Sequence, residues 1–137
     1  MSNSLNKILY LEDDPHISEV AMIALRDIGG LDVVHCASGA EALEALKSFE
    51  PDLLLFDVML PDMDGPGTLA AVRQVEGFEK TPVIFMTAKA QKHEQEQYMA
   101  LGALTVIVKP FDAVMLADSL RSVWSARKQS ESVEPIA

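Results

Sequence analysis

The sequence predicts a doubly wound α/β domain, in which a parallel sheet of five strands is covered by helices on both faces. Short apolar runs recur at a steady interval and are nearly continuous rather than alternating, which is typical of strands buried on both sides. Segments with helical spacing separate these runs, and such alternation favours parallel strands joined by right-handed crossovers. The predicted strands are residues 7–11, 31–36, 52–57, 81–86 and 104–108.

The first predicted helix follows the first strand. It begins at Pro15, because proline fits the first helical position and Asp14 can cap the free N–H groups. Its apolar residues keep a spacing of three and four until the glycines at 29–30, which are expected to end it.

The second predicted helix begins after Ser38, which has capping-box spacing to Glu41, and ends near Pro51. A third is expected over residues 66–77 and a fourth over 90–101. The segment before the third helix contains Asp62, Asp64 and Gly65, which are interpreted as turn residues, with Gly65 allowing a positive φ.

The last predicted helix runs from Asp112 to Arg127. Phe111, just before the cap, and Leu116 have the spacing of a hydrophobic staple. The polar residues that follow, 128–137, are expected to be a disordered tail.

Composition excludes several classes of protein. The chain has 137 residues, the size of one domain, and its one cysteine, Cys36, cannot form an intramolecular disulfide. A net charge of −10 argues against binding to a nucleic acid backbone. No apolar run approaches the roughly 18 to 20 residues of a membrane helix, so we expect a cytoplasmic protein without membrane contact.

Polar residues stand where the apolar runs end. Glu12 and Asp13 follow the first run, Asp57 the third, Thr87 the fourth and Lys109 the fifth. In an open parallel sheet, ligands bind outside the carboxyl ends of the strands, so these five residues are expected to meet at one edge.

The chemistry of these residues points to a metal ion and an anion. Three crowded carboxylates repel one another, and a divalent cation such as Mg²⁺, which prefers oxygen ligands, would relieve the repulsion. Lys109 and Thr87 would then suit a phosphoryl group held against the metal. An ionised carboxylate such as Asp57 is a recognised nucleophile for phosphoryl transfer.

Four segments resemble the receiver domain of two-component response regulators: ILYLEDDP, LLLFDVMLPDMDG, FMTAK and GALTVIVKPF. They occur in the family's order and spacing, and the resemblance covers about residues 6–125. It implies a flavodoxin-like fold with strand order 2-1-3-4-5 and five helices, similar to single-domain chemotaxis regulators. Residues 1–127 would then form one receiver domain without an output domain.

The resemblance also implies a role for each site residue. Asp57 would accept a phosphoryl group from a histidine kinase or a histidine phosphotransfer protein. Asp13, Asp57 and the backbone carbonyl of Met59 would bind Mg²⁺ directly, and Glu12 would act through metal-bound water.

Two further residues would complete the site. Thr87 would be the switch hydroxyl and Lys109 the phosphoryl-binding lysine, with a cis Lys109–Pro110 bond. Val106 stands where the family often has an aromatic switch residue, so transmission is expected to rest on Thr87, the loop after it and the fourth helix.

We therefore expect a phosphorylation-controlled signalling switch that acts through protein contacts, as a monomer or weak dimer, with an unknown downstream target. It would modify only itself and would not be an enzyme in the usual sense. The alternatives are a Mg²⁺-dependent phosphatase or phosphotransferase with an aspartyl-phosphate intermediate, a flavodoxin-like binding module, and a receiver fragment of a larger regulator or hybrid kinase.

Overall fold

The computed structural model describes residues 4–88 and 91–132 of the chain, with side chains up to Arg127. Its five strands form one parallel sheet in the order β2-β1-β3-β4-β5, which confirms the predicted fold class. The strands are β1 (Lys7–Leu11), β2 (Asp32–Cys36), β3 (Leu53–Asp57), β4 (Val83–Thr87) and β5 (Val106–Val108).

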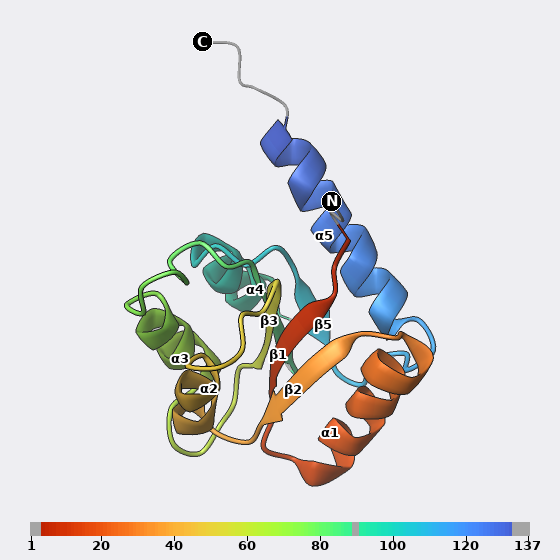
Figure 1. The fold of residues 1–137 in the computed structure, drawn as a ribbon, viewed down its shortest axis with the longest axis horizontal. Coiled ribbons are helices and arrows are strands. Elements are labelled where there is room, and N and C mark those ends of the chain that lie inside the picture. The colour runs from red at the N-terminus through yellow and green to blue at the C-terminus, as the bar shows by residue number, and fades with distance from the viewer. Residues whose placement is uncertain (1–3, 89–90, 133–137) are drawn as a thin grey trace.

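Helices cover both faces of the sheet (Figure 1). One face carries α1 (Pro15–Met22), its continuation η1 (Ile23–Ile28), and α5 (Leu116–Ser132). The opposite face carries α2 (Gly39–Ala45), α3 (Gly65–Val72) and α4 (Lys92–Ala100). Among the described residues, no helix is both long and apolar enough to cross a membrane.

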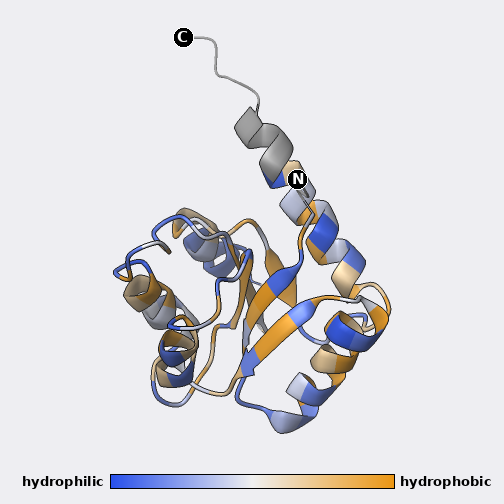
Figure 2. Cartoon of the chain, viewed as in Figure 1, coloured by the Kyte–Doolittle hydropathy of each residue, from blue (hydrophilic) through white to orange (hydrophobic). Residues whose placement is uncertain are grey.

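Two apolar cores lie on the two sides of the sheet, and Figure 2 shows the apolar strands between them. In β1, Ile8 and Tyr10 pack towards α1 and α5, whereas Leu9 and Leu11 pack towards the other helices. Every residue of β3 and β4 is buried. Burial on both faces explains why these strands are continuous apolar runs rather than alternating ones.

The first helix begins as predicted and changes its hydrogen bonding halfway. Asp14 Oδ1 accepts hydrogen bonds from the backbone N–H groups of His16 (2.9 Å) and Ile17 (3.3 Å). From Ile23 the chain continues as the π-helical segment η1, which the apolar spacing did not indicate. Gly30, with φ of 71°, then turns the chain towards β2.

The second helix is capped as predicted but is shorter. The Glu41 N–H donates to Ser38 Oγ at 3.2 Å, and the Glu41 carboxylate reaches back to the Ala37 N–H at 3.3 Å. The helix ends at Ala45 rather than near Pro51, because tighter bonds follow, such as that from the Lys47 N–H to the Glu44 carbonyl (3.1 Å).

The third helix also differs from the prediction. It spans Gly65–Val72 instead of 66–77, and Asp64 is its N-cap, accepting from the Gly67 N–H at 2.7 Å. The expected positive φ at Gly65 is wrong, since the described glycines with positive φ are Gly30, Gly77 and Gly102. Close packing, described below, is the reason for a glycine at 65.

The last helix begins and ends later than predicted. Asp112 accepts from the N–H groups of Val114 (3.0 Å) and Met115 (3.3 Å), so it caps a turn, and α5 begins only at Leu116. The helix continues to Ser132, past Arg127, and projects beyond the sheet (Figure 1). The remainder of the expected tail, 133–137, lies outside the described residues.

The fourth helix is the one with the least burial. None of the residues of α4 is buried, and its main inward contact is Tyr98, whose ring centroid lies 5.5 Å from that of Phe85 in β4. This agrees with the polar sequence of the segment and leaves α4 attached to the sheet through few apolar side chains.

Candidate functional site

The predicted site residues meet at the carboxyl edge of the sheet. Asp57 is the last residue of β3 and Thr87 the last residue of β4. The Glu12 N–H extends the β1–β2 ladder by donating to the Cys36 carbonyl at 3.0 Å, and the Lys109 N–H donates to the Thr87 carbonyl at 2.8 Å. The parallel ladder therefore carries these residues to one place.

Lys109 joins two acidic side chains. Its Nζ lies 2.9 Å from Glu12 Oε1 and 2.9 Å from Asp57 Oδ1. The side chains of Glu12 and Asp57 are 1% and 4% exposed, and that of Lys109 is 14% exposed. A buried carboxylate pair requires such a cation, because unpaired charges of one sign are costly to bury.

Burial and charge act in opposite directions on these groups. Burial raises the pKa of the Glu12 carboxyl and the charge on Asp57 adds to the rise, whereas the hydrogen bond from Lys109 opposes it. Burial pushes the pKa of Lys109 down, but its bonds to Glu12 and Asp57 outweigh this and leave it raised. Lys109 is therefore a cation at neutral pH.

The acidic residues have the arrangement of a cation site. Glu12, Asp13 and Asp57 each offer a carboxylate oxygen, and these oxygens lie within 4.8 Å of one another. Asp13 is exposed, whereas the other two are buried, so an ion at this place would keep contact with water. Few carboxylates, all-oxygen donors and access to water fit Mg²⁺.

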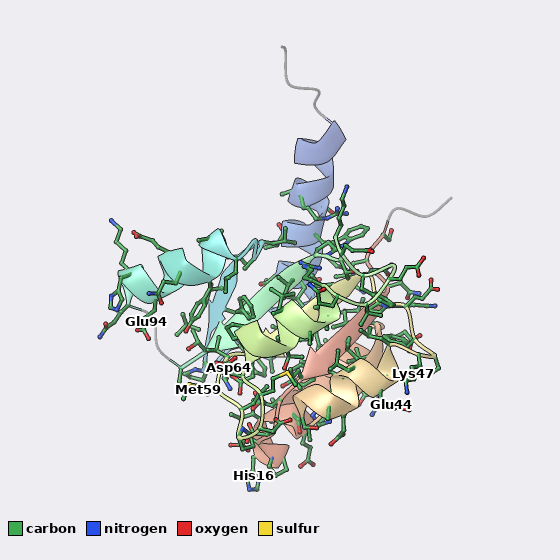
Figure 3. The ribbon with its side chains drawn as sticks, turned by 90° about the vertical axis from the view of Figure 1, so that its left-hand side faces the viewer. His16, Glu44, Lys47, Met59, Asp64 and Glu94 are labelled. Atoms are coloured by element: carbon green, nitrogen blue, oxygen red, sulfur yellow. The ribbon has the colours of Figure 1, made fainter. Side chains whose placement is uncertain are left out.

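The loop after β3 turns back sharply over Asp57. The Val58 N–H donates to the Met86 carbonyl at 2.9 Å, and the Gly65 N–H donates to the Val58 carbonyl at 2.9 Å. Met59, the residue after Val58, leads into the loop and is labelled in Figure 3. It is 65% exposed. The assignment of the Met59 carbonyl as a metal ligand stays a prediction.

Thr87 is buried, with 2% of its surface exposed. It is two residues beyond Phe85, so its side chain leaves β4 on the same face as the ring that contacts Tyr98. Thr87 therefore lies on the side of β4 that packs against α4, and its role as a switch hydroxyl stays a prediction. The Lys109–Pro110 bond is cis, as the resemblance implies.

An apolar pocket beside Lys109 was not predicted from the sequence. It has a volume of about 450 Å³ and is lined by His16, Ile17, Val20, Ala88, Pro110 and Phe111. The available signal was in α1, where Ile17 and Val20 lie three residues apart on one helix face. Val20 is 47% exposed and is one of the apolar residues that this helix leaves at the surface.

Comparisons with known proteins identify the class. Residues 8–121 match the family described as the response regulator receiver domain. The solved structures that resemble the chain include the chemotaxis response regulator CheY4 of Vibrio cholerae, 29% identical with a TM-score of 0.78, covering 88% of this chain and 99% of that one. The receiver domain of a histidine kinase from Syntrophus aciditrophicus is 29% identical, with a TM-score of 0.75 over 96% of this chain and 99% of that one.

Curated relatives agree with this result. The transcriptional regulatory protein CpxR of Escherichia coli strain K12 is 34% identical over an alignment of 131 residues, which covers 92% of this chain and 54% of CpxR. The probable C4-dicarboxylate response regulator DctR of Priestia megaterium is 32% identical over 130 residues, 94% of this chain and 56% of DctR. The chain thus spans about half the length of these relatives.

The chain belongs to the response regulator receiver domain family of two-component signal transduction. Receiver domains are phosphoryl-accepting switches that interact with histidine kinases or phosphotransfer proteins. The acidic pocket at the edge of the sheet is compatible with Mg²⁺ and with phosphorylation of an aspartate.

Proposed function

We propose that Asp57 accepts a phosphoryl group from a phosphohistidine and that the modified domain then changes its contacts with a partner protein. One observation carries this proposal. Asp57 ends a buried strand with Oδ1 held 2.9 Å from the Lys109 ammonium, inside a cluster of three carboxylates whose oxygens lie within 4.8 Å. A fixed carboxylate with a cation beside it is suited to attack on phosphorus.

The reaction would be an in-line displacement. A carboxylate oxygen of Asp57 forms the new P–O bond while the P–N bond to the donor imidazole breaks, and its electron pair stays on the leaving nitrogen. Lys109, already within hydrogen-bond distance of Asp57, would stabilise the negative charge on the transferred group. Thr87 at the end of β4 would donate a hydrogen bond from its hydroxyl to the same group.

Magnesium would be held by Asp13, Asp57 and the Met59 carbonyl, with Glu12 acting through water. When bound, the ion supplies positive charge to the phosphoryl oxygens. The oxygen donors, the partial exposure of the cluster and its excess of negative charge support this assignment.

The apolar pocket offers a place for the phosphodonor to dock. A donor histidine must come within bonding distance of Asp57, so the donor protein has to cover the surface around Lys109. Ile17, Val20 and Phe111 present apolar area there, and removing apolar area from water favours protein association.

The relatives support a second possibility for what phosphorylation of the domain controls. CpxR and DctR are described as regulators and are about twice as long as the matched region. These residues would then be the receiver part of a larger regulator, and phosphorylation would act on attached segments. A monomer or weak dimer without nucleic-acid contacts of its own remains our proposal for the domain itself.

A phosphatase is the less favoured alternative. Such enzymes generally need a second carboxylate two residues after the nucleophile, and that residue is Met59 here. The pocket beside the site is lined mostly by apolar side chains, which are poorly suited to bind a polar phosphate ester. We therefore propose no turnover of a separate substrate.

The test is phosphorylation by acetyl phosphate. Purified protein incubated with acetyl phosphate and Mg²⁺ should gain the mass of one phosphoryl group, and Asp57→Asn should gain none while keeping its melting temperature. Removal of Mg²⁺ with EDTA should also prevent the gain. Normal labelling of Asp57→Asn would refute the assignment of Asp57.

A further inference from the structure

His35 holds the peptide bond that joins the two adjacent acidic residues of the site. Its Nε2 lies 2.8 Å from the main-chain carbonyl oxygen of Glu12. A carbonyl oxygen only accepts, so Nε2 carries the hydrogen and donates it. This carbonyl belongs to the peptide unit between Glu12 and Asp13, and its direction affects where the Asp13 side chain leaves the backbone.

The contact replaces a strand hydrogen bond at the point where β1 and β2 part. The ladder pairs Tyr10 with His35 and Leu11 with Cys36, and the Glu12 N–H still donates to the Cys36 carbonyl at 3.0 Å. Beyond Cys36 the chain bends towards the Ser38 cap of α2. The His35 ring then supplies the donor that a continuing strand would have provided.

The ring itself is held in place. It packs on the Tyr10 ring with a centroid distance of 5.4 Å and an interplanar angle of 39°. Tyr10 is fully buried, and its hydroxyl has no hydrogen-bond partner within the described part of the chain. The Tyr10 ring therefore packs beside the imidazole, and its hydroxyl takes no part in this contact.

Glu12 is consequently fixed at three points. Its N–H is bound to the Cys36 carbonyl, and its carboxylate accepts from Lys109 Nζ at 2.9 Å and from the Asp14 N–H at 3.2 Å. His35 holds the third group, the carbonyl. Because these three groups of Glu12 are fixed, the backbone that follows holds Asp13 in one orientation. The Asp13 carboxylate then lies near the buried carboxylate of Asp57.

We propose that His35 is a positioning residue for the divalent cation: by donating to the Glu12 carbonyl, it orients Asp13 towards Glu12 and Asp57. The proposal rests on the metal site of the proposed function. It does not depend on titration of the imidazole, because the neutral Nε2–H form and the imidazolium both donate this hydrogen bond. Groups that orient the ligands of a metal typically change metal affinity by about 10- to 100-fold when removed.

The test compares three substitutions of His35 and one control in the full chain, with Mn²⁺ as the probe and binding read by electron paramagnetic resonance. His35→Leu and His35→Met remove the donor and keep apolar volume, whereas His35→Gln keeps an N–H at a similar reach. We expect the first two to weaken Mn²⁺ binding by about tenfold and His35→Gln to bind close to wild type. Tyr10→Phe, which deletes only the unpartnered hydroxyl, is the matched control and should bind like wild type.

A second readout separates positioning from general damage. In acetyl phosphate reactions, His35→Leu should need a higher Mg²⁺ concentration for half-maximal rate, while its rate at saturating Mg²⁺ stays near that of wild type. Thermal melting identifies variants that are folded, and His35→Met takes the place of His35→Leu if the latter is not.

Two outcomes would overturn the proposal: wild-type Mn²⁺ affinity in the folded donor-free variant, or equally weak binding in His35→Gln. Failure of the metal site itself would be seen differently. In that case wild-type protein would not bind Mn²⁺, or Asp13→Asn and Asp57→Asn would bind it as well as wild type does.

Discussion

Gly65 at the start of α3 packs directly against the backbone of Asp57: a Cβ atom at residue 65 would lie 2.3 Å from the Asp57 carbonyl oxygen. The Gly65 N–H also donates to the Val58 carbonyl at 2.9 Å, so the start of α3 is bound to the end of β3. The absence of a side chain at 65 therefore sets how closely α3 approaches the proposed phosphorylation site.

Gly65→Ala should displace the Asp57 carbonyl, because backbone atoms cannot rotate out of the way. Forcing a methyl group into a packed site typically costs about 1–3 kcal/mol, and we expect a loss of that size in the free energy of unfolding. Acetyl phosphate labelling should slow as well. Gly67→Ala is the comparison for labelling: its Cβ would meet Asp64 Oδ1, the cap of α3, so it should cost some stability but leave the backbone of Asp57 in place. Equal slowing of acetyl phosphate labelling in the two variants would contradict this account.

Lys109→Met should destabilise the protein in the absence of metal, because two buried carboxylates lose their cation. Lys109 is 14% exposed, so we expect a loss of about 1–3 kcal/mol, below that of a fully buried pair. Lys47→Met is the control: its partner Glu44 lies at 2.9 Å, but both side chains are over 70% exposed (Figure 3), and such pairs contribute about 0–1 kcal/mol.

The same variant should respond more strongly to magnesium. In wild type, Lys109 Nζ occupies one oxygen of Glu12 and one of Asp57. Without the ammonium, both oxygens are available to the ion and the site is more negative, so Mg²⁺ should raise the melting temperature of Lys109→Met more than that of wild type. An equal or smaller rise would show that lysine and metal do not share these oxygens.

The Cys36 thiol should be unreactive in the folded protein. Burial raises its pKa from 9.0 to about 11, and the nearby Glu41 charge adds to the rise. About a hundredfold less thiolate is then present at pH 8 than in the unfolded chain. Labelling with Ellman's reagent should be correspondingly slow without urea and fast in urea. Rapid labelling of the folded protein would contradict the burial of Cys36.

The sign of the linked stability change follows from the same shift. The folded state binds the thiol proton more tightly than the unfolded state does, so this stabilisation is fully present below pH 9. It is lost as the pH rises towards 11, the folded-state pKa of Cys36. Cys36→Ala should therefore lose less stability than wild type between these pH values, as measured by urea unfolding.

Val20→Asn should separate docking of a donor protein from the chemistry at Asp57. Val20 is 47% exposed and lines the pocket beside Lys109, but it belongs to none of the ligand or phosphoryl contacts. The rate of phosphotransfer from the cognate histidine kinase should fall by about tenfold, which corresponds to a loss of roughly 1.4 kcal/mol of binding free energy. Acetyl phosphate labelling should be unchanged. Val114→Asn, at a residue 66% exposed and outside this pocket, is the control.

The strands and the site residues were predictable for one reason. Parallel strands buried on both faces appear as short continuous apolar runs, and their carboxyl ends must lie at the same edge of the sheet. Glu12, Asp57 and Lys109 could therefore be placed together from their positions after such runs. The structure confirms this through the two 2.9 Å contacts of Lys109.

Helix ends were less predictable, because they depend on tertiary packing more than on local pattern. The apolar spacing after Asp112 was helical, yet that residue caps a turn and α5 begins at Leu116. Gly65 was interpreted through conformational freedom, whereas its actual role is to leave room for the Asp57 carbonyl.

The sequence by itself determined the order of the elements, the acidic cluster and the lysine that balances it, because these follow from the pattern of burial and the direction of the strands. Only the tertiary structure decided the pocket beside Lys109 and the support of the Glu12 carbonyl by His35. Both join residues from separate elements, and contacts of that kind depend on how close two backbones pass and not on the spacing along either one.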